Sequence, residues 1–555
     1  MKIAGILNAM SLFTDIIQRI NTEPKKAPQP LPETKSGFDE PIYKQDQQHP
    51  SIAYMYLKRK FRDLGRMNAI IETLGRDFLT AMPNGAYQSR LGQISFMHRL
   101  MHEDLTEEET QRWLDRARDH QYKSPDDWDE WDTANLNEMT NMYLMFTNVD
   151  PDLIEDKARL SYEGRNHHRA LKETGDWEQA KGFLSAQIDL NRKIADARCK
   201  TLGVDSHYQM LMQEFMPGMT IYDTELLFNS HEDALNKIYP LIQAKQASES
   251  PPIEIDAKYD SESQMWLNRS LLEVIGFDFE RGGLYETGHN PVEGGTVDDT
   301  RLVISNVDET NFLNSMKSAL HEGGHGIYIQ GLPRQSWRYQ PVAMDLGAAV
   351  HESQALLIEM ILGRTPEFFE FLSPRLEGLF HGMNNQALSP ENLYKRKTRI
   401  KPGVDRKKAD EVTYFFHVNL RFKLERDLID GSLSINDLPE AWVEGMHASL
   451  GVLPENHLDG CLQDVHWFVG KFGYFPAYAL GHMMAAQFHN TMKKEIPDMS
   501  EQISEGDFSQ IQGWLNENIY RHGRLMSTKE MLKKATGKEL RAEYLEKHLR
   551  KRYLD

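Results

Sequence analysis

The sequence predicts a mainly α-helical protein that carries one small β-sheet. From about Ser51 to the end of the 555-residue chain, apolar residues recur every three to four positions, which is the spacing of an amphipathic helix. Residues 282–312, "GGLYETGHNPVEGGTVDDTRLVISNVDETNF", break this pattern, because glycines and an Asn-Pro pair surround the β-prone "TRLVIS". No repeat of fixed period occurs, which disfavours a solenoid. We therefore expect a large helical body with a hairpin or small sheet directly before the helix predicted at residues 318–332.

The first 50 residues are predicted to form an extension outside this body. Residues 1–20, "MKIAGILNAMSLFTDIIQRI", place apolar side chains at helical spacing. Polar interruptions at Asn8, Ser11 and Asp15, with no small-residue cleavage site behind them, favour an amphipathic docking helix over a secretion signal. Residues 23–50 are rich in Pro, Lys, Glu and Gln, which is typical of a linker. We predict that residues 51–555 form one helical domain.

The helices of this domain are predicted from periodicity and from their start signals. Residues 54–79, 106–120 and 176–203 each place apolar side chains on one face. The segments "SPDDWDEW" (124–131) and "DPDLIEDKARL" (150–160) combine a Ser or Asp cap with an acidic first turn, which is typical of a helix start.

Composition excludes several classes of protein. The formal charge of −19 argues against nucleic-acid binding, because phosphate backbones need a basic surface. With Cys199 and Cys461 as its only cysteines, the chain cannot have a disulfide framework, and a cytoplasmic location is expected. No run of about 18 apolar residues occurs, so no membrane-spanning helix is expected.

The segment "HEGGH" predicts a metal site. His321 and His325 are four residues apart, so on a helix their imidazoles project from one face and can bind one ion. Glu322 lies one position further round, beside the coordination position that water would occupy. Zn²⁺ held by three protein ligands lowers the pKa of a bound water towards about 7, and a neighbouring carboxylate can accept its proton.

The third ligand has two acidic candidates. Tyr328 and Gly331 occupy the positions where a metzincin needs Gly and His, so that class is excluded. Asp345 and Glu352 both follow at a suitable distance. Glu352 lies in "GAAVHESQALLIEMILG", a predicted second helix, and an antiparallel helix pair would bring its start back to the histidines.

Two further residues of that segment have predicted supporting roles. His351 is expected to contact a ligand or the substrate rather than the metal, because neighbours on a helix point about 100° apart. Glu359, two turns beyond Glu352, is expected to be a structural or supporting carboxylate.

Five stretches together resemble one family, the carboxypeptidase Taq metallopeptidases. "HEGGH" and "HESQ" match its metal motifs, and "GCLQDVHW" (460–467) fits its Gly-x-x-Gln-Asp-x-His-Trp signature. "RKKADEVTY" (406–414) and "FGYFPAYALG" (472–481) are also similar to family segments, and the resemblance runs from about residue 52 to the C-terminus. It implies a large helical peptidase fold with a long substrate groove, similar to neurolysin and angiotensin-converting enzyme. It also implies a homodimer that removes single residues from peptide C-termini with broad specificity, and one zinc or cobalt ion per chain.

The resemblance also implies roles for individual residues. The metal ligands would be His321, His325 and Glu352, with Glu322 as general base. Recognition of a free terminal carboxylate calls for an arginine, because a guanidinium binds carboxylate bidentately, and the family motif gives this role to Arg406. The remaining candidates are His466, Tyr474 and Tyr478 for the oxyanion, and Arg301, His351, His289 and Gln463 for the substrate.

The sequence departs from the family motifs at two places near these candidates. Asp405 stands where the family has isoleucine, and it could pair with Arg406 or be exposed. Val303 replaces a threonine, so a hydroxyl contact near Arg301 is lost.

Two other functions fit the same residues. An oligopeptidase would cut internal bonds with the same metal chemistry, and a noncatalytic helical scaffold would use the metal only for stability. Two residues distinguish a carboxypeptidase from these alternatives. An endopeptidase does not need Arg406 as a carboxylate anchor, and a scaffold does not need Glu322 as a general base.

The glycines of "HEGGHG" need an explanation, because a glycine inside a helix costs about 1 kcal/mol relative to alanine. We expect Gly323 and Gly324 to let another helix or strand approach closely. We expect Gly326, one turn beyond Glu322, to leave space for water or peptide.

Overall fold

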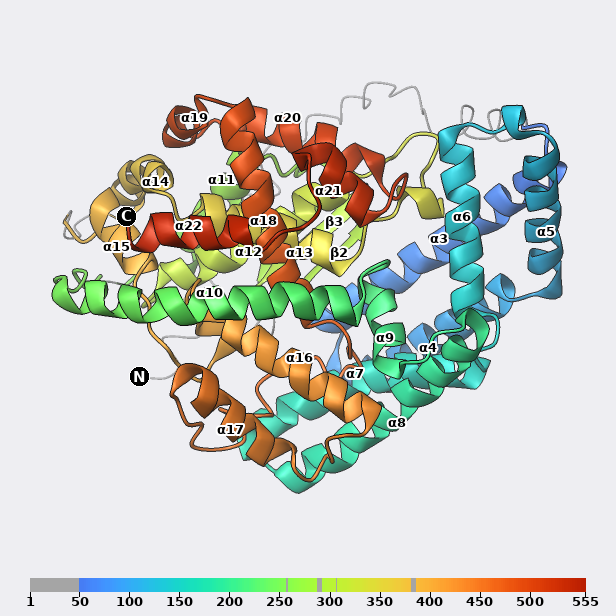
Figure 1. Ribbon diagram of the computed structural model, residues 1–555, viewed down its shortest axis with the longest axis horizontal. Coiled ribbons are helices and arrows are strands. Elements are labelled where there is room, and N and C mark those ends of the chain that lie inside the picture. The colour runs from blue at the N-terminus through green and yellow to red at the C-terminus, as the bar shows by residue number, and fades with distance from the viewer. Residues whose placement is uncertain (1–48, 256–257, 287–291, 306, 381–385) are drawn as a thin grey trace, which may run out of the picture. The chain divides into compact units, whose positions relative to one another are not determined.

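The structure is a computed structural model that describes residues 49–255, 258–286, 292–305, 307–380 and 386–555. The predicted N-terminal helix, nearly all of the predicted linker and His289 lie outside these residues. Residues Pro50–Asp555 form one compact unit. This unit is built mainly of helices and holds one small sheet, so the predicted fold class is confirmed (Figure 1).

In the first half of the unit, the described residues form helices joined by turns and loops. Asp129 and Asp150 cap two of its helices through their side chains, at the starts that the acidic segments predicted. These elements are α3 (Ile52–Thr80), η1 (Asn84–Ala86), α4 (Tyr87–Leu105), α5 (Glu108–Lys123), η2 (Pro125–Asp127), α6 (Glu130–Phe146), α7 (Pro151–Thr174), α8 (Trp177–Leu202), α9 (His207–Phe215), α10 (Ile221–Ser248) and α11 (Ser261–Val274).

The glycine-rich stretch forms a three-stranded sheet, as predicted. Its strands are β1 (Gly282–Glu286), β2 (Val292–Thr296) and β3 (Asp299–Ile304). The order is β1-β3-β2, with β1 parallel and β2 antiparallel to β3. The buried side of β3, which includes Leu302 and Ile304, packs on the helix that follows, so the sheet lies directly against the "HEGGH" segment.

The second half of the unit begins with two helices that run close together. These are α12 (Phe312–Gly331), which carries "HEGGH", and α13 (Ala348–Leu356), which continues into the π-helical turn η4 (Leu357–Leu362). The remaining elements are η3 (Pro341–Ala343), α14 (Pro366–Leu379), α15 (Pro390–Lys397), η5 (Arg406–Lys408), α16 (Tyr414–Asp430), α17 (Leu438–Leu450), α18 (Pro476–Glu495), α19 (Met499–Glu505), α20 (Ser509–Asn518), η6 (Tyr520–His522), α21 (Thr528–Thr536) and α22 (Glu543–Tyr553).

None of the helices formed by the described residues has both the length and the apolar character needed to cross a membrane.

Helix α13 packs closely against α12 on one side and α18 on another. A Cβ added at Gly324 of α12 would lie 2.5 Å from the Gln354 carbonyl oxygen and 2.6 Å from the Ala355 Cα. A Cβ added at Gly481 of α18 would lie 2.8 Å from the Cβ of Glu352. Real Cβ atoms do not approach backbone so closely, so these two glycines permit the packing. The expected close approach at Gly324 is confirmed.

The prediction for Gly326 is wrong. A Cβ at this position would lie 2.7 Å from the Phe277 ring and 2.9 Å from Leu302 of β3. The face of α12 one turn beyond Glu322 is therefore covered by the sheet and the Phe277 ring, and not by water or peptide. Gly326 lets the sheet pack on the helix.

We predict that Gly324→Ala destabilises the protein by about 1 to 3 kcal/mol, because the new methyl group meets backbone that cannot move alone. Gly323→Ala should cost less, since its Cβ would meet only the ends of the Leu272 and Ile275 side chains. The control is Gly378→Ala in α14, where no heavy atom lies within 4 Å and replacing a helical glycine should be neutral or stabilising by about 0.5 to 1 kcal/mol. Urea denaturation measures all three, and equal stability of the Gly324 and Gly378 variants would contradict the packing argument.

Candidate metal centre and substrate groove

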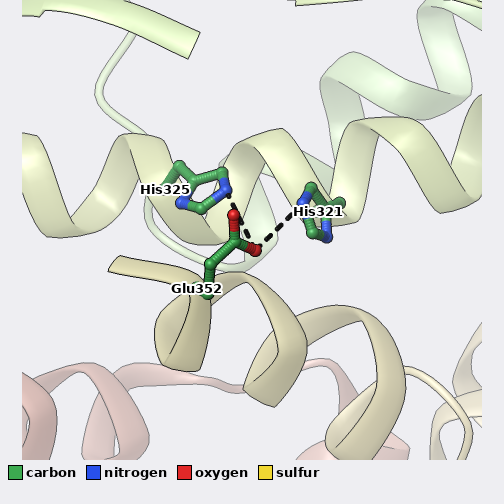
Figure 2. Close-up of side chains that lie close together, drawn as sticks. All are labelled: His321, His325 and Glu352. Atoms are coloured by element: carbon green, nitrogen blue, oxygen red, sulfur yellow. Dashed lines mark ion pairs between the residues drawn. The ribbon is translucent and has the colours of Figure 1, made fainter. Parts of the chain in front are cut away.

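Three side chains from α12 and α13 converge on one point. The Nε2 atoms of His321 and His325 lie 3.7 and 3.9 Å from Oε2 of Glu352 (Figure 2). Among the described residues, this is the one group of three metal-binding side chains whose ligand atoms all lie within 4.8 Å of one another. Two imidazoles and a carboxylate facing a shared space are a donor set that fits a divalent ion such as zinc.

The other acidic candidate, Asp345, is not part of this group. Its side chain accepts a hydrogen bond from the Gly347 backbone at 2.8 Å, and its carbonyl accepts one from Arg524. The structure therefore brings Glu352 to the histidines and leaves Asp345 in the loop before α13.

Each histidine is also held at its other ring nitrogen. Nδ1 of His321 lies 3.2 Å from Oε2 of Glu359, which lies in the π-helical turn η4. Nδ1 of His325 lies 2.5 Å from Nδ1 of His351. Such contacts fix the ring orientation and leave Nε2 directed at the shared point. His351 thus contacts a predicted ligand, which is one of the two roles expected for it.

The carboxylate of Glu359 is itself held by cations. It accepts a hydrogen bond from Arg364 at 2.7 Å, and the Lys317 ammonium lies 3.9 Å away. Burial alone would raise the pKa of Glu359, but the charges of Lys317, His321 and Arg364 hold it below its usual value. Glu359 therefore stays ionised and is suited to accept a hydrogen bond from Nδ1 of His321.

A groove with a volume of about 1540 Å³ opens onto this cluster. It runs between α3, α4 and α7 on one side and β3, α12 and α13 on another. Nine of the residues predicted for the site line it: His321, Glu322, His325, His351, Glu352, Arg406, His466, Tyr474 and Tyr478. Glu322 is buried at 3% exposure directly beside the histidine pair.

Two neutral hydrogen-bond donors lie near the cluster. The hydroxyl of Tyr478 lies 3.0 Å from Nε2 of His466. Burial, followed by the charge of Arg406, holds the pKa of His466 well below its usual value. Burial also raises the pKa of Tyr478 well above its usual value, so both groups are uncharged near pH 7. The third candidate, Tyr474, donates to Oε1 of Glu352 at 2.8 Å.

Arg406 is paired with a buried aspartate. Its Nε and Nη2 donate to Oδ1 of Asp464 at 3.0 and 2.8 Å, while Nε of Arg421 donates to Oδ2 at 2.5 Å. Burial would raise the pKa of Asp464, but the two arginines hold it well below its usual value. The Asp405 side chain instead accepts from the Lys407 backbone at 3.0 Å and does not determine the position of the guanidinium.

Two of the described candidates lie outside the groove lining. The Arg301 guanidinium donates to Asp299 and to the Tyr285 hydroxyl. The Gln463 amide accepts from the Arg406 backbone and from Arg421, and donates to two carbonyls, those of Val404 and Asp459. A substrate contact at either residue stays a prediction.

Glu425 of α16 is a supporting residue that the sequence did not reveal. Its buried carboxyl accepts from the Tyr208 hydroxyl at 2.6 Å and from Nε1 of Trp467 at 3.1 Å. Burial raises the pKa of Glu425 to about 8, although hydrogen bonds from Tyr208, Trp467 and the backbone on both sides of Tyr474 lower it. This one carboxyl therefore holds the segment that carries His466 and Tyr474. One feature of the sequence could have indicated this role, namely that Glu425 is an acidic residue on the apolar face of the helical segment "NLRFKLE" (419–425).

Comparisons with known proteins identify the family of the chain. A model of the carboxypeptidase Taq (M32) metallopeptidase family matches residues 56–553. The thermostable carboxypeptidase 1 of Pyrococcus furiosus is 28% identical over 498 residues, which covers 89% of this chain and 97% of that protein. Carboxypeptidase 1 of Bacillus subtilis is 31% identical over 389 residues, which covers 68% of this chain and 76% of that protein.

A solved structure extends the likeness to the fold. Metallocarboxypeptidase 1 of Trypanosoma cruzi aligns with a TM-score of 0.85 at 32% identity, over 91% of this chain and 99% of that one. The chain therefore belongs to the carboxypeptidase Taq (M32) metallopeptidase family and is a metallocarboxypeptidase with the helical fold of its relatives.

Proposed function

We propose that this enzyme releases single amino acids from the C-termini of peptides with broad specificity, and that it uses one zinc ion held by His321, His325 and Glu352. The observation that carries the proposal is the convergence of these three side chains on one point in the groove wall, with Glu322 beside them. Cobalt is an alternative, because two imidazoles and a carboxylate bind several divalent ions.

A bound divalent ion would supply Lewis-acid activation of the scissile carbonyl and lower the pKa of a water towards about 7. The carboxylate of Glu322 would accept the proton of the attacking water and pass it to the leaving amine. Its place on α12, one residue after His321, supports this role, because both side chains then border the same part of the groove.

The oxyanion that develops on the substrate carbonyl needs a hydrogen-bond donor. His466 and Tyr478 are suited to this task because both are uncharged near pH 7 and each still carries a donor hydrogen, an N–H on the imidazole and the O–H on the phenol. Tyr474 is the alternative. Its hydroxyl contacts Glu352 and could turn from that carboxylate to the substrate.

Arg406 is proposed to bind the terminal carboxylate of the peptide. Asp464 occupies two of its nitrogens and thereby fixes the plane of the guanidinium, whose centre lies 4.9 Å from the Tyr478 ring centroid. A fixed guanidinium in the groove wall can bind carboxylate with little loss of side-chain freedom.

We also propose a homodimer in the cytoplasm. The homodimer rests on the family resemblance alone. The location is supported by the absence of a disulfide between the two cysteines, since Cys199 and Cys461 are both free thiols.

Glu322→Gln should lower peptide turnover by about 100- to 10,000-fold while metal content stays normal, because an amide cannot accept the proton of the attacking water. Mass spectrometry of the products and elemental analysis of the protein measure the two quantities. Glu262→Gln, an exposed position on α11, is the matched control. Undiminished turnover in Glu322→Gln would instead support the noncatalytic scaffold.

For the wild-type enzyme, kcat/KM should be about 100-fold or more higher for a peptide with a free C-terminal carboxylate than for the same peptide with a C-terminal amide. Arg406→Ala should bring this ratio towards one, and Arg406→Lys should keep part of it because the charge is retained. Equal losses on both peptides in Arg406→Ala would rule out the carboxylate anchor. Internal cleavage of both peptides by the wild type would favour the oligopeptidase.

Glu359→Gln should weaken metal binding by about 10- to 100-fold, because a neutral amide oxygen is a weaker hydrogen-bond acceptor for His321 than the carboxylate and can be replaced there by the amide nitrogen. Metal retained after dialysis against graded chelator concentrations measures the change. Glu377→Gln, an exposed carboxylate on α14, serves as control. Identical metal retention in the two variants would show that the Glu359 contact does not support the ion.

A further inference from the structure

An arginine of α22 connects this helix to two segments of the proposed active site. The helix packs on α10 and α18 (Figure 1), and none of its residues, all of which the structure describes, lines the groove. The side chain of Arg552 is 6% exposed and contacts both the π-helical turn η4 and the segment between η5 and α16. Arg552 therefore lies away from the substrate, and any effect on the reaction must pass through these two segments.

The guanidinium of Arg552 holds the end of η4. Its Nη1 and Nη2 donate to the carbonyl oxygens of Met360 and Ile361 at 2.6 and 2.7 Å. The last carbonyls of a helix have no partner within the helix, so donors from elsewhere in the chain satisfy them. Two hydrogen bonds from one planar group fix both peptide groups, which directly follow Glu359.

A buried carboxylate fixes the guanidinium in turn. Nη1 of Arg552 also donates to Oε2 of Glu411 at 2.8 Å, and Glu411 is fully buried. Two further groups of α22 contact the same carboxylate, namely Nε2 of His548 at 2.9 Å and the Tyr553 hydroxyl at 3.0 Å. Burial alone would raise the pKa of Glu411, but the charge of Arg552 holds it well below its usual value. Glu411 is therefore ionised, and the ion pair leaves the guanidinium little freedom to turn.

The contacts continue from η4 to a proposed metal ligand. Glu359 precedes Met360 in the turn, and its Oε2 lies 3.2 Å from Nδ1 of His321. Its other carboxylate oxygen accepts from Arg364 at 2.7 Å. Single π-helical turns are rare and frequently lie at functional sites. A shift of the backbone at Met360 would move the Glu359 carboxylate and so change the direction of the His321 ring.

We propose that Arg552 is a positioning residue of the metal centre: by holding the end of η4, it places Glu359 against His321 and so increases the affinity of the site for a divalent ion. The inference rests on the ligand set proposed above and adds to it a residue that lies outside the groove. A purely structural role of Arg552 would lower the stability of the fold without a specific loss of metal affinity.

The test measures how strongly Arg552→Met retains Zn²⁺ against graded chelator concentrations. The substitution removes the three hydrogen bonds of the guanidinium and keeps an apolar stem. Binding should be about tenfold weaker than in the wild type, as is typical when a residue that holds a metal ligand is lost. Arg550→Met is the matched control with wild-type affinity expected, because this arginine is exposed on the same helix. Circular dichroism establishes that each variant is folded at the assay temperature.

Arg552→Lys is the second variant, should Arg552→Met fold poorly. Its ammonium keeps the positive charge beside Glu411, but a compact group cannot hold two carbonyls in a fixed plane. Zn²⁺ binding should therefore still be weaker than in the wild type, by about threefold or more.

A double-mutant cycle separates the proposed route from a general structural effect. If Arg552 acts through Glu359, either Arg552 variant should weaken Zn²⁺ binding by less than about twofold in a Glu359→Gln background. An equal loss in both backgrounds overturns the inference, and so does wild-type affinity in both Arg552 variants. In these cases the proposed function stands if the wild type retains Zn²⁺ and releases C-terminal residues. A wild type that retains neither Zn²⁺ nor Co²⁺ refutes both.

Discussion

The close approach of α12 and α13 sets the position of every proposed metal ligand. Gly324 and Gly481 remove the side chains that would separate α13 from its two neighbours, so the backbones nearly touch. Glu352 then faces two histidines from a different helix at less than 4 Å. The two glycines lower the intrinsic stability of their helices, because glycine is a poor helix former. Any larger residue at these positions would keep the helices apart.

Buried carboxyl groups organise the opposite wall of the groove. Asp464 forms ion pairs with two arginines from separate segments, and Glu425 connects α9, α16 and the segment before α18 through hydrogen bonds. Burying a charged or polar group is costly unless partners surround it, so these two residues tie the segments into one arrangement. Arg406, His466 and Tyr478, the side chains proposed to face the substrate, are positioned by these contacts.

The fold class and the metal cluster could be predicted from the sequence because both depend on local spacing. Helical periodicity, caps at Asp129 and Asp150, and the four-residue step from His321 to His325 are short-range signals. The choice between Asp345 and Glu352 depended on how two helices pack, and the expected antiparallel helix pair and the family resemblance both favoured Glu352. The environment of Gly326 was misjudged for the same reason, because a helical wheel gives directions and does not reveal which neighbour covers them. Pairs such as Arg406 with Asp464 join residues 58 positions apart, and the support from Glu425 reaches across three segments, so neither has a local signature.

The two carboxylates of the α13 and η4 segment hold His321 from opposite edges of its ring. Glu352 faces Nε2 and Glu359 contacts Nδ1, while His351 and Tyr474 brace the other two ligands. Each of the three proposed ligands therefore has a second contact inside the protein that limits the rotation of its side chain. Because Glu359, His351 and Tyr474 each hold a different ligand, loss of one of these contacts is expected to loosen one donor and leave the other two in place.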